Sequence, residues 1–233
     1  MSSITFGRNS SSTYGLIVAP YEIPAPPVQT NYVSVPGRDG SLDMSEAFGH
    51  VIYGDRVINL TLFAVGDYQT RVTNFLNAVH GSKMSIVFDK DSTHYYQGRV
   101  EISGIEKRDG YCAISVTITA DPYKYDNSET TVTINGTGRT TLSNGKMPVV
   151  PTVVCTAEAT ISITVNLHVT TITLSAGTHV VPELALSPNG SLRVNVTSEG
   201  KTTFKYRTGW PRLGDRQDMR AGQVRDGLGR GVP

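Results

Sequence analysis

The sequence is poor in cysteine, tryptophan and charge. Its 233 residues include two cysteines and one tryptophan, and 18% of them are charged, against about 25% in typical soluble domains. Cys112 and Cys155 form no Cys-x-x-Cys pair and no other metal-type spacing, so we expect both to be small buried hydrophobic residues. A chain of this length can bury a core without disulfides or a metal. It has room for one large domain or two small ones.

Long apolar runs are missing too. No run approaches the roughly 18 residues that span a membrane, and residues 1–8 lack the apolar stretch of a signal peptide. The formal net charge is +1, which gives no indication of nucleic-acid or membrane binding. We therefore expect a soluble protein made in the cytoplasm, with no specific nucleic-acid binding and no membrane insertion.

The sequence also contains no recognisable catalytic motif. Nucleophile-elbow and phosphate-loop sequences are absent, and the five histidines have no metal-ligand spacing. Asp89 and Asp91 begin like a calcium loop, but His94 occupies the sixth position, where glycine is needed for the sharp turn. We therefore predict that the chain is not an enzyme and has no catalytic residue, no cofactor and no metal.

Alternation of apolar and polar residues is the dominant pattern in the first half of the sequence. Apolar residues recur at every second position, for example at Ile58, Leu60 and Leu62, which is typical of half-buried strands. Asp109-Gly110 precedes another alternating run and predicts a hairpin turn. Residues 67–80 instead follow one helical stripe, made of Tyr68, Val72, Phe75, Leu76 and Val79. Residues 1–126 are therefore predicted to form a β-sandwich or barrel-like domain with one covering α-helix.

The composition changes after residue 126. The following 80 or so residues are rich in threonine, and short strands separated by Asn-Gly turns predict a small β-sandwich. The predicted strands cover residues 131–134, 149–155, 161–165, 171–174, 192–196 and 202–206. We place the domain boundary near residue 126 and the sandwich over residues 127–207. The arginine- and glycine-rich residues 208–233 are predicted to be a flexible tail.

Two loops of the first half combine glycine with opposite charges. Residues 35–42 are a turn-rich loop with Arg38-Asp39 at its centre, and Tyr53-Gly54-Asp55-Arg56 repeats the arrangement at the next turn. Each loop can be read as an ordinary solvated loop. Each can also be read as a contact surface, because strand edges in a sheet-rich protein of low charge must be paired, covered or blunted.

The order of these segments resembles a known family. Residues 35–43, the run 53–56, the predicted helix, the strand that contains Tyr95-Tyr96-Gln97-Gly98-Arg99, and Ala120-Asp121-Pro122-Tyr123-Lys124 follow one another in this sequence. Together they resemble the N-terminal domain of the distal tail proteins of siphovirus-type bacteriophages. The resemblance covers roughly residues 1–126 and rests on the ordered set. The stretch after Arg207 departs from it.

The resemblance implies a structural virion protein at the tail tip, assembled in the host cytoplasm. Family members form a homo-hexameric ring with their first domain, and a galectin-like or carbohydrate-module-like β-sandwich follows outside the ring. The implied partners are the tail tube protein, the tail-associated hub protein and a receptor-binding protein. Charge pairs in such a contact would fix its register. The expected interface residues are Arg38, Asp39, Tyr53, Asp55, Arg56 and Tyr123.

Two alternatives come from other classes of protein. A carbohydrate-binding accessory module would need an exposed aromatic platform, and residues 127–206 offer only Phe204 and Tyr206, both on a strand that we expect to pack the core. Trp210 falls in the predicted tail. A tail-tube protein of related fold is the second alternative. It would be expected to have one domain and to polymerise into long tubes.

Overall fold

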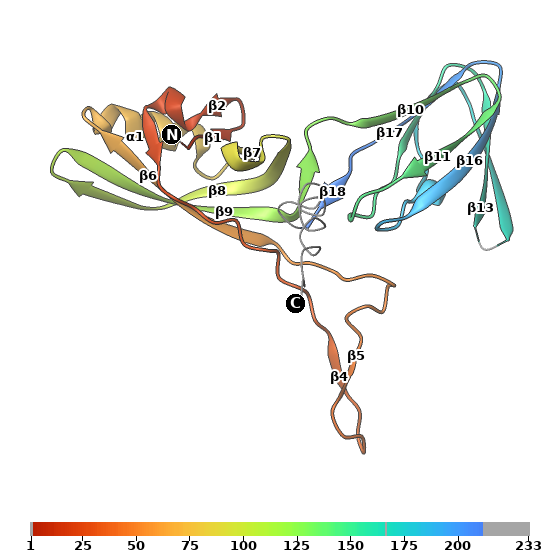
Figure 1. The fold of residues 1–233 in the computed structure, drawn as a ribbon, viewed down its shortest axis with the longest axis horizontal. Coiled ribbons are helices and arrows are strands. Elements are labelled where there is room, and N and C mark those ends of the chain that lie inside the picture. Colours follow the sequence, from red (N-terminus) through yellow and green to blue (C-terminus); the bar gives the residue numbers. More distant parts are fainter. Residues whose placement is uncertain (1, 166, 212–233) are drawn as a thin grey trace, which may run out of the picture.

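The computed structural model of the chain describes residues 2–165 and 167–211. The protein is mainly β with one α-helix in this part of the chain. Figure 1 shows two β bodies beside each other and a thin hairpin that extends away from both. None of the described helices is long and apolar enough to cross a membrane.

The first body is an eight-stranded antiparallel sheet. Its strand order is β2-β1-β7-β8-β9-β6-β3, and β18 pairs with β9 off this path. The strands are β1 (Ile4–Phe6), β2 (Asn9–Ser10), β3 (Leu16–Val18), β6 (Arg56–Val65), β7 (Lys83–Phe88), β8 (His94–Arg108), β9 (Tyr111–Asp126) and β18 (Gly209–Trp210). Short 3-10 helices η1 (Ser11–Tyr14) and η2 (Asp89–Asp91) lie in its connections.

The predicted alternation determines which face of this sheet is buried. Ile58, Leu60 and Leu62 of β6 are buried, and β6 pairs with β9 along its whole length. Because successive side chains alternate across a strand, one face of this strand pair packs in the core. β8 and β9 are joined at Asp109-Gly110, where Gly110 has a φ of +79°. The predicted hairpin turn is therefore confirmed.

The predicted helix is also confirmed. α1 (Tyr68–Val79) packs its stripe on the sheet through Val72, Phe75 and Val79, which are buried. Phe75 is the centre of this contact, since its ring meets those of Phe6 and Tyr14 edge-on at centroid distances of 5.3 and 5.4 Å. The opposite side of the helix is exposed, as the amphipathic spacing requires.

The second body consists of two four-stranded sheets, with orders β10-β17-β12-β15 and β11-β16-β13-β14. The strands are β10 (Thr130–Asn135), β11 (Gly138–Ser143), β12 (Thr152–Cys155), β13 (Ala159–Val165), β14 (His168–Leu174), β15 (Gly177–Val180), β16 (Ser191–Ser198) and β17 (Lys201–Tyr206), and η3 (Pro182–Leu184) is a 3-10 helix between β15 and β16. All six predicted strands are present with shifted ends. β11 and β15 were not predicted, because each has a single large apolar residue, Leu142 and Val180.

The buried hydrophobic residues form two clusters. One lies within residues 4–120 and the other within residues 134–206. The second cluster draws on both four-stranded sheets, which makes this body a β-sandwich. Cys112 belongs to the first cluster and Cys155 to the second, and both are free and buried, as predicted. The domain boundary near residue 126 and the galectin-like character of the sandwich stay predictions.

The start of the predicted tail differs from the expectation of a solvated segment. Thr208 is buried, and β18 returns to the first sheet with the pairs Gly209↔Tyr125 and Trp210↔Lys124. Composition alone did not reveal this pairing, because β18 is too short to show alternation. The rest of the predicted tail, residues 212–233, lies outside the described residues.

Candidate assembly interface

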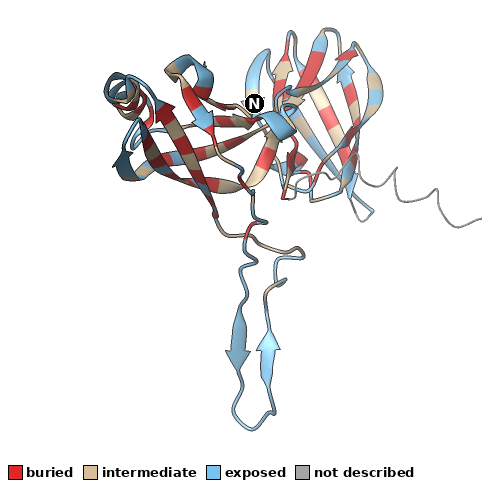
Figure 2. Cartoon of the chain, turned by 60° about the vertical axis from the view of Figure 1, so that its left-hand side comes forward, coloured by how far each residue is buried: buried red, intermediate tan, exposed pale blue. Residues whose placement is uncertain are grey.

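Residues 28–53, which we call the arm, form the thin hairpin that leaves the first sheet. The arm departs after β3 and returns before β6, which are paired neighbours at one edge of the sheet. A bridge between Val28 and Tyr53 closes its base, and β4 (Tyr32–Ser34) pairs with β5 (Ser41–Asp43) farther out. Figures 1 and 2 show that the arm extends away from both β bodies.

The arm exposes an unusual amount of apolar surface. Every residue of β4 and β5 is exposed, and Phe48 and Tyr32 are 78% and 61% exposed. The other exposed large apolar residues of the arm are Val28, Val33, Val35, Leu42 and Met44. An isolated two-stranded hairpin is marginally stable in water, and apolar surface exposed to this extent marks an interaction site. The exposed apolar side chains of the arm are therefore typical of a surface that a partner covers.

Arg38 and Asp39 lie at the tip of the arm. Both are exposed, and they are flanked by Gly37 and Gly40, whose φ angles of +81° and +75° are readily adopted only by glycine. The predicted turn-rich loop of residues 35–42 is thus the turn between β4 and β5. Its two opposite charges are free to meet a neighbouring molecule.

Tyr53 and Tyr123 meet at the base of the arm. Their rings are edge-on with centroids 6.0 Å apart, and burial raises the pKa of the Tyr123 hydroxyl. Asp55 follows Tyr53 in the chain and is exposed. The structure therefore brings Tyr53 and Tyr123 together and places Arg38 and Asp39 in a separate group at the tip.

The structure places Arg56 inside the protomer, which removes it from the expected interface residues. Its side chain is 1% exposed and donates hydrogen bonds to the carbonyl oxygens of Pro122 (2.8 Å) and Pro211 (2.5 Å). The guanidinium carbon lies 5.1 Å from the centroid of the Tyr96 ring, and burial lowers the pKa of Arg56. Arg56 lies two residues before Ile58 on β6 and therefore shares its buried face. The alternation along this strand is the sequence signal that could have predicted the burial of Arg56.

A polar network, which we call the junction, lies where β9 ends. His94 Nδ1 is 2.6 Å from Asp91 Oδ1, and its Nε2 is 3.0 Å from Asp126 Oδ1. Lys124, only 2% exposed, reaches Asp91 Oδ2 at 2.9 Å. Both ring nitrogens of His94 thus face carboxylate oxygens, one on η2 and one at the end of β9.

The chain that returns from the second body completes the junction. Arg207 donates to the carbonyl oxygens of Asp126 (2.5 Å) and Asn127 (2.8 Å), and its guanidinium lies over the Tyr95 ring at 5.5 Å. The Thr208 hydroxyl donates to the Asp126 carboxylate. These contacts join the end of β9 to the segment after β17. Local sequence patterns do not predict these contacts, because they connect residues about 80 positions apart.

Replacing Asp91 with asparagine is expected to lower the free energy of unfolding by about 2 kcal/mol at pH 7. Burial alone would raise the pKa of this carboxyl, but hydrogen bonds from His94 and Lys124 outweigh it and lower the pKa from 3.8 to about 2. A depressed pKa adds stability above the unfolded value, and that stability is lost as the pH falls toward 2. The stability difference between the two proteins, measured by urea denaturation, should therefore shrink below about pH 4.

Asp109→Asn is the matched control for this experiment, because Asp109 is exposed in the turn between β8 and β9 and Asn-Gly suits such a turn as well as Asp-Gly does. It should leave the free energy of unfolding unchanged. A similar loss in both variants would show that the junction does not account for the effect.

Comparison with known proteins bears on the fold. No family model and no curated protein matches the sequence. Among solved structures, the chain is similar to a crystal structure of the SPP1 Dit (gp 19.1) protein, described as a paradigm of the hub adsorption apparatus in phages that infect Gram-positive bacteria. The TM-score is 0.64 at 13% identity, and the match covers 90% of this chain and 99% of that one. The chain therefore has a Dit-like fold.

Proposed function

We propose that the protein is a distal tail protein of a siphovirus-type bacteriophage. In this proposal it is a structural component of the tail tip, assembled in the host cytoplasm, and it makes or breaks no covalent bond. Six copies close into a ring that joins the tail tube to the tail-associated hub protein and the receptor-binding apparatus. The observation that carries the proposal is the similarity to the hub protein of SPP1, which extends over both β bodies and nearly the whole length of each chain.

The arm is the element that we assign to the contact between subunits. A ring requires a heterologous interface, in which one patch of each copy meets a different patch of the next. The exposed apolar residues of the arm supply the area, and Arg38 and Asp39 at its tip are positioned to fix the register with a neighbour. Tyr53 and Tyr123 hold the base of the arm against the end of β9.

The second body is proposed to serve as a docking platform outside the ring. A sugar-binding platform would need exposed aromatic residues. Phe204 and Tyr206 are instead buried in the core of the second body, at 0% and 4% exposure, as expected from the sequence. Trp210 pairs with β9 of the first sheet. These positions favour the ring protein over the carbohydrate-binding module that we considered as an alternative.

Light scattering on the purified chain tests the proposal. At tens of micromolar we expect a particle of six times the chain mass of 25.2 kDa, because permanent interfaces of this kind bury on the order of 2,000 Å² or more. If the chain alone is monomeric, the tail tube protein of the same phage should be added as a template. A monomer or dimer under both conditions would contradict the proposal, and long tubes would favour the tail-tube alternative.

A further inference from the structure

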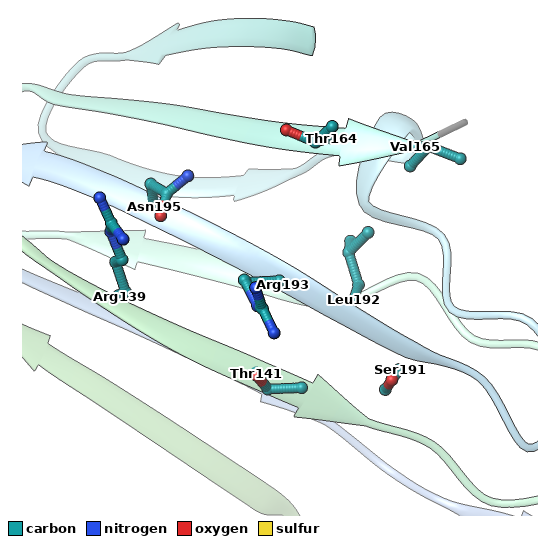
Figure 3. Close-up of a pocket in the computed structure, with 8 residues that line it drawn as sticks. All are labelled: Arg139, Thr141, Thr164, Val165, Ser191, Leu192, Arg193 and Asn195. Carbon is teal, nitrogen blue, oxygen red and sulfur yellow. The ribbon is translucent and has the colours of Figure 1, made fainter. Parts of the chain in front are cut away.

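A polar groove crosses the outer face of one sheet of the second body. Its volume is about 720 Å³, and strands β11, β13 and β16 contribute to it. Figure 3 shows the side chains that line it. They are Arg139, Thr141, Thr164, Val165, Ser191, Leu192, Arg193 and Asn195. Most of them are hydroxyl, amide or guanidinium groups.

The strand register brings two arginines together in this groove. Arg139 of β11 lies opposite Asn195 of β16, and Thr141 lies opposite Arg193. Arg139 and Arg193 are therefore diagonal neighbours on the same face, a spacing of about 7–8 Å that long side chains can bridge. Two like charges at this distance repel each other, so their proximity favours an anion between them.

No acidic residue compensates these charges within the sheet. The sequences of β11, β13, β14 and β16 contain no aspartate or glutamate. Within residues 2–165 and 167–211, the side chain of neither arginine forms an ion pair or a hydrogen bond. The internal arginines Arg56 and Arg207, by contrast, donate to backbone carbonyl oxygens.

The remaining lining groups suit a ligand rich in hydroxyl groups. Thr141, Thr164 and Ser191 can both donate and accept hydrogen bonds. Asn195, which lies opposite Arg139 across the strand pair, adds an amide group that can donate as well as accept.

We propose that this groove binds the phosphate group of a sugar phosphate or polyol phosphate. Arg139 and Arg193 are its cationic ligands, because the planar guanidinium matches phosphate oxygens in a bidentate geometry. The hydroxyl and amide groups beside them contact the sugar or polyol. The site is independent of ring assembly, since it uses only residues of one sheet of the second body.

The groove fits an acidic peptide less well. Protein interfaces place aromatic or large apolar anchors at their centre, whereas Leu192 is buried beneath the groove and Val165, 49% exposed, is the large apolar side chain that reaches its surface. A small phosphate ester needs no such anchor.

Isothermal titration calorimetry of the full chain tests the site. The probes are glycerol 1-phosphate, inorganic phosphate, glycerol and a glutamate-rich peptide. We expect glycerol 1-phosphate to bind one saturable site, inorganic phosphate to bind more weakly, and glycerol not to bind. The double variant R139Q/R193Q should bind glycerol 1-phosphate at least about tenfold more weakly, because it loses two charge-assisted contacts. Both arginines are exposed, so folding should be unaffected, which far-UV circular dichroism checks.

The double variant K146Q/K201Q is the matched control, since it removes the same charge from exposed lysines outside the groove. It should bind as the parent chain does. Equal weakening in both double variants, or no saturable binding of any phosphate probe up to about 10 mM, would overturn the proposal. Equal affinity for inorganic phosphate and glycerol 1-phosphate would overturn its polyol part, and tighter binding of the peptide would overturn the choice of ligand.

Discussion

Replacing residues 30–51 by an Asn-Gly turn is expected to abolish ring assembly and leave the protomer folded. The new turn would join Gln29 to Ile52, which are already linked by a backbone hydrogen bond of 2.8 Å, and Asn-Gly is the favoured two-residue hairpin connection. Because the strands of the arm are exposed and bury nothing of the core, their loss should not change the circular dichroism spectrum or the denaturation midpoint. Light scattering should then report a monomer.

Point variants test the same surface without changing the length of the chain. Y32S/F48S removes the two most exposed aromatic side chains of the arm. If they are buried at the centre of the contact, each truncation should cost at least about 2 kcal/mol per interface, a weakening of roughly 30-fold or more. The concentration at which rings dissociate should rise accordingly, as measured by light scattering over a dilution series.

V169S/V180S is the control for these variants. Val169 and Val180 are 67% and 68% exposed but belong to the second body, so their truncation should leave assembly unchanged. If the shortened chain still forms rings, or if the control dissociates them equally, the arm is not the subunit contact.

Phe75→Ala is expected to give the largest loss of stability, about 3–5 kcal/mol. Phe75 is fully buried, and its ring contacts Phe6 of β1 and Tyr14 of η1. Its removal leaves a cavity between α1 and the sheet that the neighbouring rings cannot fill. Urea denaturation at a concentration where the chain is monomeric measures the effect, so that assembly does not contribute.

Asn74→Ala, on the exposed side of the same helix, is the control for Phe75→Ala. Alanine has a higher helix propensity than asparagine, so this variant should be unchanged or slightly more stable. A loss below about 1 kcal/mol for Phe75→Ala would contradict the packing of α1 described above.

Local periodicity was enough to predict the central strands of the first sheet and its helix, but not the short strands β1, β2, β3 and β18. The alternation of β6 and the Asp109-Gly110 turn identify the central strands, because each signal depends on neighbouring residues alone. The helical stripe of residues 67–80 is equally local. The second body was predicted with less detail, since β11 and β15 carry too few apolar residues to show a pattern.

The functional surfaces were predicted less well, because they depend on contacts between distant residues. The sequence identified Arg38-Asp39 as a turn but not as the tip of a projecting hairpin, since the exposed strands β4 and β5 show no alternation. Arg56 appeared to belong to a surface turn, although it bonds to Pro211. The pairing of Arg139 with Asn195 requires the register of β11 and β16, which sequence alone did not supply.

The most direct test of the central claim is negative-stain electron microscopy of the assembled chain. The proposal predicts closed rings with sixfold symmetry and an open centre, in which the arm of each copy contacts the neighbouring copy. Particles without rotational symmetry, or open tubes of indefinite length, would contradict it.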